Sequence, residues 1–271
     1  PYRGCEHGCI YCYARPSHAY LNLSPGLDFE TRLIARPGID KVLEGELRRP
    51  AYRVASLSIG TNTDPYQPVE REHGLMRGVL SVLSAFKHPV WITTRGTMIE
   101  RDIDLIAPMA AQGLAAVSVS VTTLDEGLAR KMEPRAPAPK RRLQIIRRLA
   151  EAGIPVRIQV SPLIPALTDH ELEAVMEAGR DAGARAANTI PLRLPLEVAT
   201  LFQDWLAATL PDRAAHVMGR VRELHGGRDY DPEFGLRMRG QGIWADLIHR
   251  RAALARKRLG LAEDLPALRT D

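Results

Sequence analysis

Short apolar runs alternate with longer amphipathic stretches along the chain from about residue 53 onward. The short runs are rich in Val and Ile and predict β-strands, whereas the longer stretches have the apolar spacing of helices. This alternation is typical of parallel strands joined by crossover helices, and it predicts an α/β fold. The predicted strands are Val54–Ile59, Val90–Thr94, Ala116–Val121, Val156–Val160 and Ala186–Ile190, and the predicted helices cover residues 69–87, 99–112, 140–152 and 168–182.

Polar residues interrupt two of these strands at every second position. Ser118 and Ser120 separate valines in one strand, and Arg157 and Gln159 separate apolar residues in the next. A parallel sheet covered by helices on both faces would read as nearly continuous apolar residues. One face is therefore expected to pack on helices, while the polar face lines a ligand site or solvated cavity, as in a parallel α/β barrel or half-barrel. The alternative is an interior filled by side chains that hydrogen-bond one another.

Local signals indicate where the predicted helices begin and end. Three of them stop at Gly113, Gly153 and Gly183, which are expected to terminate them in the left-handed conformation. Thr168 and Glu171 have the spacing of a capping box, in which the two side chains satisfy the first free amides of a helix.

Beyond Pro191 the pattern changes to long amphipathic helices, predicted at Leu196–Leu210, at Arg213–Leu224 and from about Ile243 to Leu259. We expect residues 1–195 to form the barrel and residues 196–271 to form a helical extension packed on it.

The composition of the 271 residues, 45% hydrophobic and 25% charged, excludes disordered and fibrous classes. No apolar run approaches the length of a transmembrane helix. A net charge of +5 permits an anionic partner without requiring one. The densest basic stretch, Lys140–Arg142 with Arg147 and Arg148, is interpreted as the solvated face of a helix rather than a nucleic-acid footprint. Because the first residue is Pro1 and not Met, we expect the natural chain to begin upstream.

All three cysteines lie within eight positions, as Cys5, Cys9 and Cys12, with the spacing C-x₃-C-x₂-C. An odd, clustered set argues against a disulfide framework and favours a reducing, cytoplasmic setting. Three neighbouring thiolates repel one another unless a cation or an iron–sulfur core neutralises them. The cluster therefore indicates metal ligation.

The spacing favours an iron–sulfur cluster over structural zinc. Zinc would need a fourth protein ligand, and only His7 or His18 lies near enough in the sequence. A [4Fe–4S] cluster on three cysteines instead leaves one iron open to a small molecule. Two alternatives remain at this point: a zinc-stabilised nucleic-acid-binding module, and an enzyme whose cluster only transfers electrons.

C-x₃-C-x₂-C with Tyr11 directly before the last cysteine resembles the cluster loop of the radical S-adenosylmethionine (radical SAM) enzymes. The flanking segments Pro1–Cys5, Tyr13–His18 and Gly60–Glu70 resemble the branch that contains spore photoproduct lyase and proteins described as DNA repair photolyases. The resemblance implies a partial parallel (β/α)6 barrel of radical SAM type, whose first strand would precede the cysteine loop and lie largely outside this sequence.

The resemblance also implies cofactors and chemistry. A [4Fe–4S] cluster on the three cysteines would bind S-adenosylmethionine and cleave it reductively to a 5′-deoxyadenosyl radical that abstracts hydrogen, with an electron from a reductant such as flavodoxin or ferredoxin. DNA is the substrate class that this branch suggests. The residues expected to contact the cofactor are Tyr11 at the adenine, Thr61 and Asn62 at the amino group, Arg95 at the carboxylate, and Ser118, Ser120 and Gln159 at the ribose or carboxylate. The alternatives are a simple turn for Asn62, a surface role for Arg95, and internal hydrogen bonds for the two serines and the glutamine.

One departure from the branch concerns the return of a hydrogen atom to the product. Photoproduct-cleaving members use an additional cysteine near the end of the second strand, where this chain has Gly60 and no cysteine outside the cluster. Tyr13 or Tyr66 are the candidates to replace it. The polar residues Asp64, Glu70, His73 and Glu133–Arg135 are interpreted mainly as solvated loop or capping residues.

Overall fold

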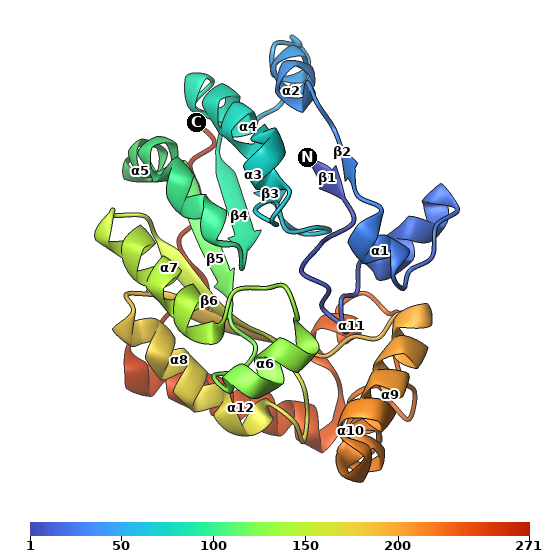
Figure 1. The fold of residues 1–271 in the computed structure, drawn as a ribbon. Coiled ribbons are helices and arrows are strands. Elements are labelled where there is room, and N and C mark those ends of the chain that lie inside the picture. The colour runs from blue at the N-terminus through green and yellow to red at the C-terminus, as the bar shows by residue number, and fades with distance from the viewer.

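The computed structural model describes all residues, 1–271. Its centre is a parallel sheet of five strands in sequence order, with helices along its outer face (Figure 1). The strands are β3 (Leu57–Ile59), β4 (Val90–Thr94), β5 (Ala115–Ser120), β6 (Val156–Leu163) and β7 (Ala186–Pro191). All five predicted strands are confirmed, although β3 begins three residues later and β6 extends three residues further than expected.

Helices connect successive strands in the predicted order. Three of the expected helices are divided: the first breaks at Gly74, which has φ +60°, and the second and fourth begin as 3₁₀ turns. The connecting elements are α3 (Glu70–His73), α4 (Leu75–Ala85), η2 (Thr97–Asp102), α5 (Ile103–Ala111), α6 (Glu126–Met132), α7 (Pro139–Glu151), η3 (Asp169–Glu171) and α8 (Leu172–Asp181).

The predicted helix ends are right, but the predicted capping box is wrong. Gly113, Gly153 and Gly183 follow α5, α7 and α8 with φ of +73°, +77° and +102°. The Thr168 hydroxyl instead accepts a hydrogen bond from the amide of Ile164 at 2.9 Å. The Glu171 carboxylate accepts from Thr123 and Leu124 in the loop after β5. Both side chains therefore form hydrogen bonds outside the first turn of the helix, where a capping box would have used them.

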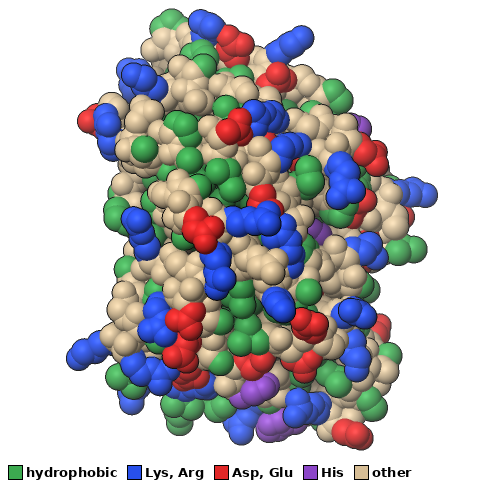
Figure 2. Space-filling model, turned by 60° about the vertical axis from the view of Figure 1, so that its left-hand side comes forward, with side chains coloured by type: hydrophobic (Ala, Val, Ile, Leu, Met, Phe, Trp, Pro, Cys, Tyr) green, Lys and Arg blue, Asp and Glu red, His purple; other side chains and the backbone are tan.

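The outer surface of α7 is polar, as predicted. Arg141 and Arg148 both form ion pairs with Glu100 at 2.6 Å. On the face shown in Figure 2, basic and acidic side chains are interspersed and form no continuous basic patch. This part of the basic stretch is therefore a solvated helix face.

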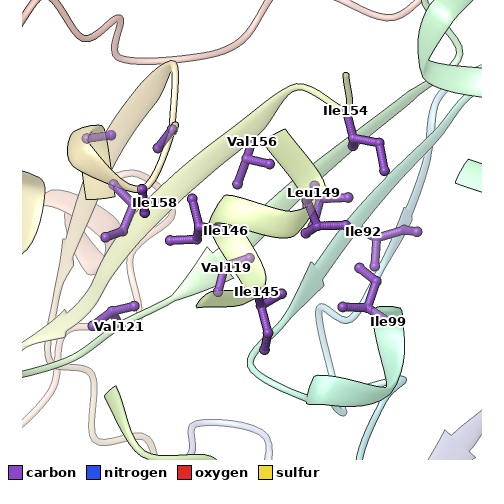
Figure 3. Packing of buried hydrophobic residues seen from close by; sticks show 14 of the residues in the cluster. Ile92, Ile99, Val119, Val121, Ile145, Ile146, Leu149, Ile154, Val156 and Ile158 are labelled. Atoms are coloured by element: carbon purple, nitrogen blue, oxygen red, sulfur yellow. The ribbon is translucent and has the colours of Figure 1, made fainter. Parts of the chain in front are cut away.

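The inner side of α7 packs on the apolar face of the sheet. Ile145, Ile146 and Leu149 are fully buried and belong to one cluster with Val119 and Val156 (Figure 3). Complete burial of each such side chain contributes about 1.5–3 kcal/mol. This cluster holds the strands in place and leaves the opposite, polar face free to line a cavity.

Of the six strands expected for the barrel, the chain carries five. Residues Tyr2–Arg3 (β1) pair antiparallel with Ile34–Ala35 (β2) in a separate small sheet instead of joining the large one. The rest of this amino-terminal segment lies on the β3 side of the molecule (Figure 1). It contains η1 (Arg15–Leu21), α1 (Asp28–Thr31) and α2 (Ile39–Leu47).

The carboxyl-terminal part is helical, as predicted: α9 (Glu197–Thr209), α10 (Pro211–Leu224), the short α11 (Leu236–Arg239) and α12 (Gly242–Leu259). Helix α12 shares the main hydrophobic core, and Arg251 on it pairs with Glu173 of α8 at 2.6 Å. No helix combines the length and apolar character needed to cross a membrane.

An extended tail follows α12 and was not predicted. Ala262 pairs with Ala186 of β7, and the amide of Arg269 donates to the carbonyl of Gly113 at 3.0 Å. Between these anchors, Leu265 packs on Ala116 and Ala186. The tail thus crosses the concave side of the sheet near the beginnings of its strands.

Candidate active site

Three thiols gather in the loop between β1 and η1. Cys5 and Cys9 are buried and Cys12 is partly buried, and none forms a disulfide. All three line a cavity of about 90 Å³, whose other side consists of the loop after β3 and the end of β4. The thiols therefore surround a space rather than pack against one another.

Burial raises the pKa of each thiol. The pKa of Cys9 rises to about 12, although the Arg95 guanidinium opposes the effect of burial. The pKa of Cys5 is raised mainly by burial and also by the nearby carboxylate of Asp64. The pKa of Cys12 is also raised by burial. A thiolate is thus costly here without a positive partner, and iron binding would both supply that charge and displace the protons. The donor set fits an iron–sulfur cluster.

The two histidines considered as zinc ligands differ in their surroundings: His7 lines the same small cavity as the thiols and its buried Nδ1 forms no hydrogen bond, whereas His18 does not line that cavity. His7 Nδ1 lies 3.5 Å from the carboxylate of Asp64, and His18 Nε2 lies 3.1 Å from the carbonyl oxygen of Arg32. No group of three His, Cys, Asp or Glu side chains has the geometry of a single-ion site. The arrangement of the thiols around a cavity favours a multinuclear cluster over one zinc ion.

Arg95, directly after β4, connects the cysteine loop to the sheet. Its Nη1 donates to Cys9 Sγ at 3.1 Å, to the hydroxyl of Tyr11 at 2.9 Å and to Glu133 Oε1 at 2.6 Å. Its backbone amide donates to Asp64 at 2.8 Å. Because every side-chain hydrogen bond leaves from Nη1, the Nε and Nη2 donors of Arg95 remain for a ligand.

Glu133 is the buried acidic centre of this network. Its carboxylate accepts from Arg95, from the hydroxyls of Tyr11 and Thr122, and from the guanidinium of Arg142. The interpretation of Glu133 and Arg142 as solvated residues is therefore wrong, since each is only 1% exposed. A buried carboxylate needs cationic partners, and Arg142 reaches it from the inner side of α7. The sequence gives no sign of this pairing.

A larger cavity, of about 500 Å³, lies beside the cysteine loop on the polar face of the sheet. The structure brings seven of the ten predicted site residues together in its wall: Cys9, Tyr11, Cys12, Thr61, Arg95, Ser120 and Gln159. Cys5 and Asn62 line the adjoining 90 Å³ cavity. Three of the four alternating polar positions, Ser120, Arg157 and Gln159, therefore face a cavity as predicted, whereas Ser118 does not.

A family comparison agrees with this geometry. Residues 1–179 match the model of the radical SAM superfamily. The chain belongs to the radical SAM superfamily. The recognition based on the cysteine loop is thereby confirmed, and the alternative of a binding module from another class is set aside.

Relatives of this radical SAM protein occur in bacteria and archaea. An uncharacterised protein of Mycobacterium tuberculosis is 39% identical over 233 residues, covering 85% of this chain and 67% of its own length. An uncharacterised protein of Methanocaldococcus jannaschii is 25% identical over 170 residues, covering 63% of this chain and 61% of its own.

Solved structures show the same fold at low sequence identity. Spore photoproduct lyase complexed with dinucleoside spore photoproduct matches with a TM-score of 0.65 at 14% identity, over 96% of this chain and 74% of that one. SuiB of Streptococcus suis, bound to S-adenosylmethionine, matches with a TM-score of 0.55 at 14% identity, over 94% of this chain and 46% of that one. The predicted radical SAM fold class is confirmed.

Ser118 is the one predicted contact that lines neither cavity. It is fully buried, and its hydroxyl accepts from Trp91 Nε1 at 2.9 Å and from Arg157 Nε at 3.1 Å. These internal bonds correspond to the alternative given for Ser118 above.

Sequence reasoning missed Asn188 of β7. The strand register places Ser120, Gln159 and Asn188 side by side across three strands, and all three line the large cavity. The buried Oδ1 of Asn188 has no hydrogen-bond partner. Such an orphan acceptor in a cavity wall is suited to a ligand donor. Only the register, which the sequence does not state, could have revealed it.

A second missed residue, Arg193, lines the large cavity beside Tyr13, which is 43% exposed, and we call this solvent-accessible part of the cavity its mouth. Its guanidinium carbon lies 4.1 Å from the ring centroid of Tyr13, whose hydroxyl donates to the carbonyl of Thr61. Tyr13 thus joins the loop after β3 to the segment after β7, at opposite edges of the sheet.

Proposed function

We propose that this protein holds a [4Fe–4S] cluster on Cys5, Cys9 and Cys12 and is a radical SAM enzyme that abstracts hydrogen from a substrate in the 500 Å³ cavity. When bound, the cluster and S-adenosylmethionine would supply the 5′-deoxyadenosyl radical. The observation that carries the proposal is the position of the three thiols: they surround a small cavity that adjoins a polar-lined cavity, with Arg95 lining both.

The chain's own residues would bind and orient S-adenosylmethionine. Arg95 offers two free donors to its carboxylate, in the planar geometry that suits bidentate binding. Thr61 and Asn62 would accept from its amino group, and Ser120 and Gln159 would bind its ribose. Tyr11 would present its ring to the adenine while its hydroxyl stays bonded to Glu133. We assign Ser118 a positioning role, because it fixes Arg157.

We infer that DNA is the substrate class. The fold of spore photoproduct lyase and the net charge of +5 support this inference. The relay of hydrogen to the product would differ, since no cysteine exists outside the cluster. Tyr66 is 1% exposed and bonded to Asp102, whereas Tyr13 lines both cavities next to Cys12. Tyr13 is therefore the better-placed candidate donor.

The partners proposed are a small electron donor such as flavodoxin or ferredoxin, and the compartment is the reducing cytoplasm. Buried, unpaired thiols that must stay free for iron are consistent with such a setting.

The test is anaerobic reconstitution with iron and sulfide, followed by reduction and addition of S-adenosylmethionine. We expect iron and sulfide in cluster stoichiometry and formation of 5′-deoxyadenosine, which Cys9→Ala abolishes. Ultraviolet-irradiated DNA should increase turnover over unirradiated DNA. A cluster without 5′-deoxyadenosine would support the electron-transfer alternative, and stoichiometric zinc in place of iron and sulfide would contradict the proposed cluster.

A further inference from the structure

Arg193 is a cation held at the cavity mouth without an acidic partner. The other two arginines of the cavity wall are paired, Arg95 with Glu133 and Arg157 with Asp264. Arg193 forms no ion pair, and its neighbours Leu192 and Leu194 are fully buried in a hydrophobic cluster. The backbone is therefore fixed on both sides of a side chain whose charge is uncompensated.

The contact with Tyr13 orients Arg193 and leaves most of its five N–H donors free. The guanidinium lies on the ring face, at 4.1 Å, and this interaction contributes about 0.5–1 kcal/mol at an exposed site. Stacking occupies the face of the guanidinium, so the N–H groups at its edge stay available. An anion entering the cavity would meet a preoriented fork of donors.

A second pair of this kind is formed by Arg237 on α11 and Phe234, which precedes that helix. Met238 of α11 lines the same cavity, and the guanidinium of Arg237 lies 5.0 Å from the ring centroid of Phe234. Phe234 is 86% exposed, and Arg237 forms no ion pair with an acidic side chain. Arginines next to exposed aromatic rings are the combination that contacts both the phosphates and the bases of a single strand.

We propose that Arg193, stacked on Tyr13, binds a backbone phosphate of a nucleic-acid substrate at the cavity mouth, and that Arg237 and Phe234 continue this contact outside the cavity. The proposal rests on the proposed function in taking this cavity as the substrate site. The cofactor carboxylate is assigned to Arg95, since Arg95 lines both cavities while Arg193 lines only the larger one.

The experiment measures binding of a fluorescein-labelled single-stranded oligonucleotide to the reconstituted enzyme by anisotropy over a range of salt concentrations. Arg193→Ala should weaken binding about tenfold and reduce the slope of log K against log salt by about 0.7. Arg193→Lys, which keeps the charge but loses the planar stack, should bind the oligonucleotide with an affinity between those of the wild type and Arg193→Ala. Arg147→Ala is the matched control, because Arg147 is an exposed arginine without an ion pair on the outer side of α7.

Four results would overturn the assignment. The first is the absence of oligonucleotide binding by the wild type, and the second is equal binding by Arg193→Ala and Arg147→Ala. Another is a loss of S-adenosylmethionine affinity in Arg193→Ala, which would make Arg193 a cofactor residue. The last is displacement of the oligonucleotide by inorganic phosphate or a mononucleotide at equal phosphate concentration, which would indicate a small-molecule anion site. Failure of the reconstituted wild type to form 5′-deoxyadenosine without DNA would contradict the proposed function, whereas loss of oligonucleotide binding alone would contradict only the assignment of Arg193.

Discussion

A β-carbon added to Gly60 would lie 1.9 Å from the carbonyl oxygen of Thr93. Gly60 also has φ +94°, which side-chain-bearing residues rarely adopt. Both constraints come from the tight turn that connects β3 to the loop beside the cysteines. The side chain of a cysteine at position 60 would therefore clash with Thr93 in this backbone.

Gly60→Ala should lower the free energy of unfolding by about 3 kcal/mol, because the clash adds to the strain of the left-handed backbone. Gly38→Ala is the control: φ is +77° there, but no atom lies within 4 Å of the added carbon. That change should cost only about 1–2 kcal/mol. Urea unfolding of both variants measures the difference, and equal losses would show that the contact with Thr93 is unimportant.

Glu133→Gln should destabilise the protein by about 3–5 kcal/mol, because it leaves the buried cations of Arg95 and Arg142 without their counter-charge. Glu100→Gln removes the partner of the partly buried Arg141 and of the largely exposed Arg148, and it should cost about 1 kcal/mol or less. Denaturant titration at pH 7 measures the free energy of unfolding of both variants. Similar values for the two variants would contradict a buried role for Glu133.

The pair Glu173–Arg251 predicts a pH dependence for the docking of α12. Hydrogen bonds from Arg251 hold the pKa of Glu173 below its ordinary value of 4.5. Since the native pKa is the lower one, the stabilisation is complete above pH 4.5 and is lost as the pH falls through the native pKa. Glu173→Gln should cost about 0.5 kcal/mol at pH 7, as the pair is partly exposed, and the difference from wild type should vanish in acid.

The same unfolding curves test domain organisation. We propose that residues 1–195 and 196–271 unfold as one cooperative unit, because α12 shares the core of the sheet. A single unfolding transition, detected alike by fluorescence and circular dichroism, is expected for the wild type and for Glu173→Gln. Two separated transitions would show an independent carboxyl-terminal unit.

Substitutions of Asn188 and Ser118 should have opposite effects, one on ligand affinity and the other on stability. Asn188→Ala removes a buried acceptor that has no partner, so stability should change by less than about 0.5 kcal/mol while S-adenosylmethionine or substrate affinity falls about tenfold. Ser118→Ala leaves Trp91 and Arg157 without their acceptor and should cost about 1–2 kcal/mol with cofactor affinity unchanged. The opposite pattern, measured by equilibrium dialysis and urea unfolding, would reverse the two roles.

Periodicity predicted the strands and the polar face of the sheet, because burial on one side imposes the alternation seen at Ser118 and Ser120. Residues whose roles depend on distant partners were not predictable in this way. Arg142 looked like its exposed neighbours in α7 until the fold placed Glu133 beneath it. Asn188 lies in the cavity wall because the strand register places it beside Gln159. Glu171 does not cap its own helix because its carboxylate accepts a hydrogen bond from Thr123 instead.

The tail after α12 has a practical consequence. Asp264 and Leu265 form part of the wall of the large cavity, and Asp264 holds Arg157 there. Cutting the chain back to Leu259 would remove this part of the wall and leave the guanidinium of Arg157 without its acidic partner. The proposed radical chemistry requires that water be kept from the reacting atoms, and the shortened wall would exclude it less well. Truncated or carboxyl-terminally fused versions of this enzyme should therefore be compared with the intact chain before any activity is assigned to them.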